Sequence, residues 1–210
     1  MRSDTCYLHL LRHGATVSNL MRPPRLQGKH VDLELSDEGR EQAERTAQAL
    51  AERPIAAVYA SPMRRALQTA EAVAALHRLS VETVKDLVEV DVGHWENMQW
   101  NEIEQNDAEN YRRFMEDPVR HGYPGGESLK QVVARVTPVF ERLAERHLGE
   151  EIVVVAHRVV NRTYLGYLLG LADYGASSVP QDNCAINLLR ARGERIKPVT
   201  INSVLHLELP

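Results

Sequence analysis

The chain has 210 residues, of which 43% are apolar and 26% charged, and its formal net charge is -4. This length and composition are typical of an ordinary globular protein and exclude an intrinsically disordered chain. The slightly acidic balance provides no global basic field, so we expect no nucleic-acid or membrane partner and only a local site for any anion.

Cysteine content and the N-terminal segment both bear on the cellular compartment. Cys6 and Cys184 are far apart in apolar surroundings, which predicts reduced core thiols rather than a disulfide framework. The first apolar run is short and is interrupted by a histidine, so the sequence predicts neither a signal peptide nor a membrane span. We therefore expect a cytoplasmic protein with a single domain over residues 1–210.

The first half of the chain alternates predicted strands and helices. Residues 6–11 form an apolar run that predicts a buried strand ending at Arg12. Ser36 precedes an acidic first turn and alanines on one helical face, which predicts a helix capped by this serine. The run 55–61 predicts a strand, and we expect Pro62 to be the first residue of the helix after it.

The second half continues this alternation after an interruption. Residues 97–123 are interpreted as a lid-like insertion into the domain. Ser128 is expected to cap the next helix, which Pro138 should kink or restart. The run 151–157 has no polar alternation, which predicts a strand at the centre of the sheet. A helix over 159–170 and strands near 184–190 and 196–201 complete the prediction.

This alternation predicts an α/β fold, a three-layer α/β/α sandwich around a mostly parallel central sheet. In such folds ligands bind beyond the carboxyl ends of the strands. His13, Ser61 and His157 each stand at the end of a predicted strand. We therefore expect these three side chains to converge on one ligand site.

The polar residues near these strand ends suit phosphate chemistry. A phosphate monoester needs cations around its oxygens, a nucleophile in line with the leaving group, and an acid for the leaving oxygen. Nearby cations also favour an unprotonated histidine nucleophile. The candidates are the guanidiniums of Arg12 and Arg65, the amide of Asn19, the imidazoles of His13 and His157, and the carboxylate of Glu89. The other histidines lack metal-ligand spacing, which predicts no metal site.

Five segments resemble the histidine phosphatase superfamily, the phosphoglycerate-mutase-like proteins, in order and in spacing. They are LRHGATVSN (11–19), SPMRRALQTA (61–70), LVEVDVGHWE (87–96), GGES (125–128) and VVVAH (153–157). Two more resemble its branch of small phosphatases, namely RLQGKHVDLELSDEG (25–39) and INSVLHL (201–207). The resemblance implies a phosphoglycerate-mutase-like fold and a phosphatase of small soluble phosphate esters that uses neither metal nor cofactor.

The resemblance also implies a role for each catalytic candidate. Arg12 would bind the phosphate, and His13 would be phosphorylated during the reaction. Arg65 matches the second arginine that clamps the phosphate. Glu89 matches the acid that protonates the leaving group and then deprotonates the attacking water, while His157 matches the histidine that polarises the phosphoryl group.

The sequence departs from the family pattern near the site. Arg158 and Val159 follow the second histidine where glycines are usual, and Asn97 replaces another common glycine. We expect Arg158 either to favour substrates with a second acidic group or to point outward into solvent. Trp95 and Trp100 are interpreted as packing residues. The candidate substrate-binding residues are Asn19, Arg12, Arg65, Arg158, Arg25 and Gln27, with loop 21–30 and segment 97–123 lining the mouth.

Several alternatives remain open from the sequence alone. Besides a phosphatase, the residues suit a cofactor-dependent phosphoglycerate mutase or a non-catalytic phosphate-ester or phosphopeptide binding module. The compact length and segment 201–207 favour hydrolysis. Asn19 can instead be a turn residue, Glu89 a surface carboxylate, and Arg65 a solvated helix arginine. The sequence does not predict the oligomeric state or the natural substrate.

Overall fold

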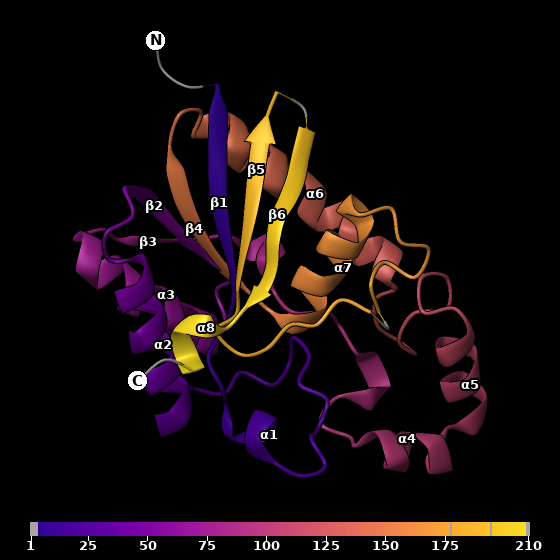
Figure 1. The fold of residues 1–210 in the computed structure, drawn as a ribbon. Coiled ribbons are helices and arrows are strands. Elements are labelled where there is room, and N and C mark those ends of the chain that lie inside the picture. Colours follow the sequence, from indigo (N-terminus) through magenta and orange to yellow (C-terminus); the bar gives the residue numbers. More distant parts are fainter. Residues whose placement is uncertain (1–3, 177, 194, 209–210) are drawn as a thin grey trace.

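The fold is built on one six-stranded sheet with helices on both faces (Figure 1). A computed structural model describes residues 4–176, 178–193 and 195–208. The strand order is β3-β2-β4-β1-β5-β6. The strands are β1 (Thr5–Arg12), β2 (Ile55–Ala60), β3 (Val81–Thr83), β4 (Glu151–Ala156), β5 (Ile186–Arg192) and β6 (Arg195–Ser203). Strands β1 to β4 pair in parallel and β5 pairs antiparallel with both neighbours, which confirms the predicted mostly parallel sheet.

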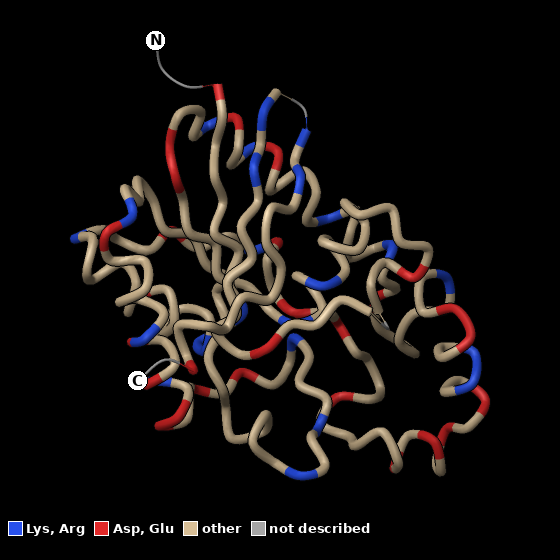
Figure 2. The backbone as a smooth tube through the Cα atoms, viewed as in Figure 1, with Lys and Arg blue, Asp and Glu red and all other residues tan. Residues whose placement is uncertain are grey.

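The helices follow the strands in the predicted alternation. They are α1 (Val17–Leu20), α2 (Asp37–Leu50), α3 (Arg64–His77), α4 (Trp100–Asn106), α5 (Ala108–Glu116), α6 (Leu129–Arg146), α7 (Arg158–Leu168) and α8 (Leu205–Glu208), with short 3₁₀ turns at η1 (Lys85–Leu87) and η2 (Gly93–Trp95). None of these helices in the described ranges is long and apolar enough to cross a membrane. Charged residues are spread along the whole backbone (Figure 2).

The two predicted helix caps are confirmed. Ser36 Oγ accepts a hydrogen bond from the Gly39 N–H at 3.1 Å, and Ser128 Oγ accepts one from the Gln131 N–H at 3.3 Å. Each bond satisfies an N–H that has no partner within its own helix. Ser36 also donates to the Ala15 carbonyl at 3.0 Å, so this cap ties α2 to the chain just after β1.

Replacing Ser36 with alanine should lower the free energy of unfolding by about 1 kcal/mol, because the Gly39 N–H loses its acceptor. Urea titration followed by circular dichroism measures this change. Ser80→Ala, which alters an exposed serine between α3 and β3, is the control. Equal losses in both variants would show that the cap contributes nothing.

One prediction about the prolines is wrong, and one of the two outcomes predicted for Pro138 does not occur. Pro62 is not the first residue of α3, because the turn after β2 extends to Met63 and the helix begins at Arg64. Pro138 does not restart a helix, because α6 runs through it from Leu129 to Arg146. The residues around Pro138 are buried, and their packing offsets the hydrogen bond that the proline removes.

The sheet buries a separate apolar cluster on each face. Leu10 packs on the side of α6 and α7, where the rings of Phe140 and Tyr164 stack 4.2 Å apart. The next residue, Leu11, faces the opposite side with Val155 and the helices α2 and α3. Neighbouring strand residues point to opposite faces, so the uninterrupted apolar runs of β1 and β4 serve both clusters. The central strands therefore hold their carboxyl ends rigidly.

An aromatic cluster attaches the segment 97–123 to the rest of the fold. The ring centroids of Trp95 and Phe114 lie 5.4 Å apart, and those of Phe114 and Tyr123 lie 4.6 Å apart. Trp95 is fully buried, which confirms its predicted packing role. Helices α4 and α5 pack on this cluster beyond the end of the sheet. The segment 97–123 therefore lies next to the carboxyl ends of the strands (Figure 1).

Candidate active site

Two histidines meet at the carboxyl edge of the sheet. β1 and β4 are neighbours in parallel register, with Arg12 opposite Ala156, so the residues after them leave the sheet side by side. The ring centroids of His13 and His157 lie 5.2 Å apart. The Oγ of Ser61, just after β2, lies 2.8 Å from His157 Nε2. These three residues lie together as predicted, and of the three His13 lines the pocket.

The backbone fixes the orientation of the His13 ring. His13 Nδ1 lies 2.7 Å from the Gly14 carbonyl oxygen. A carbonyl only accepts hydrogen bonds, so Nδ1 carries the proton and the lone pair is on Nε2. Gly14 is tightly enclosed, because a Cβ there would lie 2.4 Å from the Gly39 carbonyl oxygen. The ring therefore presents one nucleophilic nitrogen.

Both histidines are unprotonated at neutral pH. Burial, followed by the charges of Arg65 and Arg12, lowers the pKa of His13 well below its usual value. Burial and then Arg65 lower the pKa of His157 in the same direction. The nearby cations lower the pKa of both histidines, as predicted, but burial lowers it more.

The low pKa values of these histidines predict acid sensitivity. Below about pH 6.5, the usual histidine pKa, the unfolded chain binds protons that folded His13 and His157 do not bind. The free energy of unfolding should therefore fall as the pH is lowered from neutral to 5. Urea titrations across this range measure the slope, and His13→Asn should make it shallower. The same slope in both proteins would contradict the prediction.

The two predicted phosphate-binding arginines are both buried. Arg12 is 8% exposed, and its Nη1 donates to the Gln181 carbonyl at 2.7 Å. Burial, with the neighbouring charge of Arg158, lowers the pKa of Arg12 to about 10. Its buried Nε has no hydrogen-bond partner among the described residues. Arg12 is thus held by one hydrogen bond, and its Nε–H has no acceptor among the described residues.

Arg65 lies beneath the pocket rather than on its wall. It is 0% exposed, which excludes a solvated helix arginine, and it donates to the carbonyls of Val31 and Gly28 at 2.8 and 3.3 Å. Within the part of the chain that the structure describes, its Nε has no partner. Burial lowers the pKa of Arg65. Its charge still reaches the site, since it depresses the pKa of both histidines.

Glu89 is a buried carboxylate at the start of α7. Only 3% of it is exposed, so it is not the surface carboxylate that the sequence left open. Its oxygens accept hydrogen bonds from the N–H groups of Val90, Val159 and Val160 at 2.8, 3.2 and 3.3 Å. The last two are first-turn N–H groups of α7, which have no acceptor within the helix. Glu89 lines the same pocket as His13.

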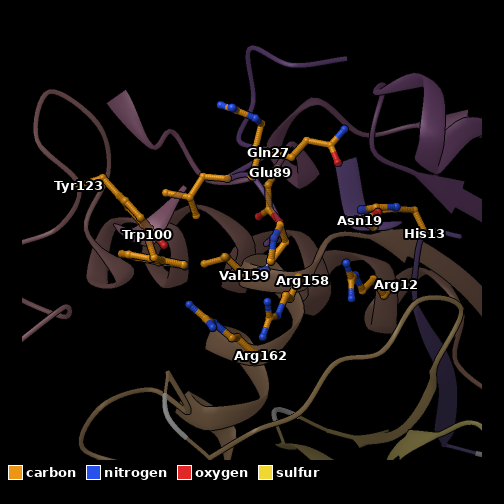
Figure 3. Close-up of a pocket in the computed structure, with 13 residues that line it drawn as sticks. Arg12, His13, Asn19, Gln27, Glu89, Trp100, Tyr123, Arg158, Val159 and Arg162 are labelled. Carbon is orange, nitrogen blue, oxygen red and sulfur yellow. The ribbon is translucent and has the colours of Figure 1, made fainter. Parts of the chain in front are cut away.

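Most of the predicted site residues line one pocket (Figure 3). They are Arg12, His13, Asn19, Arg25, Gln27, Glu89 and Arg158. The other two, Arg65 and His157, are fully buried behind it. Loop 21–30 and segment 97–123 both contribute lining residues, as predicted.

Asn19 is a turn residue that also lines the pocket. Its Oδ1 accepts hydrogen bonds from the Thr16 N–H and hydroxyl at 3.0 and 3.1 Å, so it shapes the turn at α1. It also lines the pocket beside His13. Gln27 lines the pocket nearby, and its Oε1 lies 3.0 Å from the Thr16 hydroxyl, whose single hydrogen is shared between Asn19 and Gln27. Thr16 therefore holds two pocket residues in place.

Six lining residues were not named as binding residues from the sequence, namely Pro24, Leu26, Trp100, Tyr123, Val159 and Arg162. Trp100 was interpreted as packing only, but it lines the pocket as well as contacting Trp95 at 6.0 Å between ring centroids. Tyr123 and Arg162 also line it. Arg162 stands one helical turn after Arg158, and this spacing on a predicted helix was a usable signal. Nothing in the local sequence distinguishes Tyr123.

Both departures from the family pattern fit the backbone. Arg158 is the first residue of α7 and has no left-handed φ, so a side chain there causes no strain. Asn97 has φ +61°, in the left-handed region that glycine and asparagine adopt most readily.

No group of three or more potential metal ligands occurs within residues 4–176, 178–193 and 195–208.

The sequence as a whole matches one protein family. Residues 8–204 match the Histidine phosphatase superfamily (branch 1). The chain belongs to this family. Phosphoserine phosphatase 1 of Hydrogenobacter thermophilus is 32% identical over 200 residues, which cover 95% of this chain and 93% of that protein.

Solved structures of histidine phosphatases share the fold. Bacillus stearothermophilus YhfR superposes with a TM-score of 0.87 at 29% identity, covering 96% of this chain and 99% of that one. The phosphoserine phosphatase of Entamoeba histolytica, solved with 3-phosphoglyceric acid, has a TM-score of 0.84 at 27% identity and covers 96% and 99%. This protein is accordingly a histidine phosphatase that hydrolyses small phosphate esters.

Proposed function

We propose that this histidine phosphatase works in two steps through a phosphohistidine on His13. The observation that carries the proposal is the His13 ring, whose Nδ1–H is bound to the Gly14 carbonyl while Nε2 remains a free base beside His157. The low pKa of His13 keeps that nitrogen unprotonated at neutral pH. A buried, oriented and unprotonated imidazole is a competent nucleophile toward phosphorus.

In the first step His13 Nε2 attacks the phosphorus, and the bond from phosphorus to the ester oxygen breaks. Glu89 gives its proton to the departing oxygen, so the product is a neutral alcohol. In the second step water attacks the phosphohistidine and the nitrogen–phosphorus bond breaks. Glu89 accepts a proton from this water, which returns both residues to their starting state and releases inorganic phosphate.

Fixed cations stabilise the charge on the phosphoryl oxygens during both steps. Arg12 lines the pocket, and Arg65 contributes positive charge from beneath. In this proposal Asn19, which lines the pocket, and His157, whose ring centroid lies 5.2 Å from that of His13, bind the same oxygens. Because these groups are already ordered by protein hydrogen bonds, little reorganisation is needed when the charge develops.

The phosphohistidine can be trapped directly. Rapid-quench mixing of the enzyme with a ³²P-labelled ester should give a protein-bound label that is acid-labile and base-stable, mapped to His13 by peptide mass spectrometry. Release of inorganic phosphate indicates the phosphatase, whereas transfer of the label to a second phosphoglycerate indicates the mutase. Turnover without any label on His13 would contradict the proposal, and binding without turnover would identify a non-catalytic module.

A further inference from the structure

Two arginines of α7 line the pocket in addition to Arg12. Arg158 and Arg162 are one helical turn apart, so their side chains emerge from the same face of the helix. In Figure 3, Arg12 and His13 lie at one end of the pocket, Tyr123 and Arg162 toward the other, and Arg158 between them. The cationic lining therefore extends well beyond the position of the reacting phosphate.

Neither of these two cations has a carboxylate partner at ion-pair distance among the described residues. No described carboxylate forms an ion pair with Arg158 or Arg162, and Glu89 is the pocket's one carboxylate among the described residues. Burial and then the charge of Arg162 lower the pKa of Arg158, so each guanidinium destabilises the other. A pair of like charges at one helical turn costs stability in the free protein, and an anion between them relieves that cost.

The donors that remain available suit an oxyanion. The buried Nε of Arg162 has no hydrogen-bond partner among the described residues. Burial raises the pKa of the Tyr123 hydroxyl, and the charge of Arg162 opposes that rise. Arg158 is the exposed member of the pair and is open to the pocket. By contrast, the fourth arginine of the lining, Arg25, donates to the Asn97 carbonyl and lies 3.6 Å from Glu102.

We infer that Arg158 and Arg162, with the Tyr123 hydroxyl, form a subsite for a second anionic group on the substrate. This inference rests on the proposed function, in which the phosphate to be cleaved lies at His13. The preferred substrates are then small phosphate esters whose leaving alcohol carries a carboxylate or a second phosphate. Forked guanidinium donors bind either group through charge-assisted hydrogen bonds.

Matched pairs of esters test the subsite. Glycerol 3-phosphate and 3-phosphoglycerate differ by one carboxylate, and fructose 6-phosphate and fructose 1,6-bisphosphate differ by one phosphate. We expect kcat/KM of the wild-type enzyme to favour the more anionic member of at least one pair by about tenfold or more, which is about 1.4 kcal/mol. The pair with the larger preference identifies the anion.

The variants Arg158→Gln and Arg162→Gln should each reduce that preference to near unity. Arg142→Gln, which changes an exposed arginine of α6 outside the pocket, should keep it. The inference is overturned if the wild-type enzyme shows no preference in either pair, or if both pocket variants retain it.

A binding experiment separates this inference from the proposed mechanism. The His13→Ala protein cannot form a phosphohistidine, yet its subsite is intact. Isothermal titration of this protein should show tighter binding of 3-phosphoglycerate than of glycerol 3-phosphate, or of the bisphosphate than of the monophosphate. Equal affinities in both pairs overturn the subsite even if turnover proceeds through His13, whereas unequal affinities support it even if the phosphohistidine is never found.

Discussion

Replacing His13 with alanine should lower kcat/KM by about 10⁴-fold or more, because the covalent route then has no nucleophile. The neighbouring His157 cannot substitute, since its Nε2 is hydrogen-bonded to Ser61. Hydrolysis of p-nitrophenyl phosphate measures the loss, and thermal unfolding with and without inorganic phosphate checks that the variant is folded.

A matched control is available on the same strand. His9 is also buried in β1, but its ring bonds Glu151 at 2.9 Å and lies outside the pocket. His9→Gln keeps a hydrogen-bonding group there, and we expect its kcat/KM to stay within a few-fold of wild type. If the His13→Ala protein retained more than about a hundredth of the activity, the role of His13 as nucleophile would be excluded.

The second large effect concerns the proton that Glu89 supplies. With Glu89→Gln, the first chemical step should slow by about 10²–10⁴-fold on an alkyl phosphate, whose alkoxide leaves poorly without a proton. The same step should slow much less on p-nitrophenyl phosphate, because p-nitrophenolate is a stable anion. The released water proton also lacks an acceptor in this variant, so hydrolysis of the phosphohistidine should become rate-limiting.

Stopped-flow kinetics distinguish these two effects. With p-nitrophenyl phosphate the Glu89→Gln protein should show a burst of p-nitrophenol about equal to the enzyme concentration, followed by slow turnover. Glu82→Gln, at an exposed pair with Arg146, is the control and should not change the time course. Equal slowing of the first step on both esters would exclude Glu89 as the general acid. Its role would then be limited to accepting hydrogen bonds from the first turn of α7.

Local rules failed where long-range packing opposed them. The helix-breaking tendency of Pro138 is a local property, but the buried face of α6 holds the helix together through it. Pro62 is a suitable first helical residue by composition, yet the chain uses two more residues to turn from β2. In both cases the sequence states a preference and the tertiary contacts set the outcome.

The sequence by itself predicted the strands, the two helix caps and the proximity of His13 and His157. Apolar runs ending at Arg12 and Ala156 specify parallel strands, and parallel strands bring the residues that follow them to one edge. Only the folded chain decided that Arg65 lies beneath the pocket and that Arg162 and Tyr123 enter it. Those positions depend on how α7 and the segment 97–123 pack against the sheet, and such packing is the sum of many contacts between residues distant in sequence.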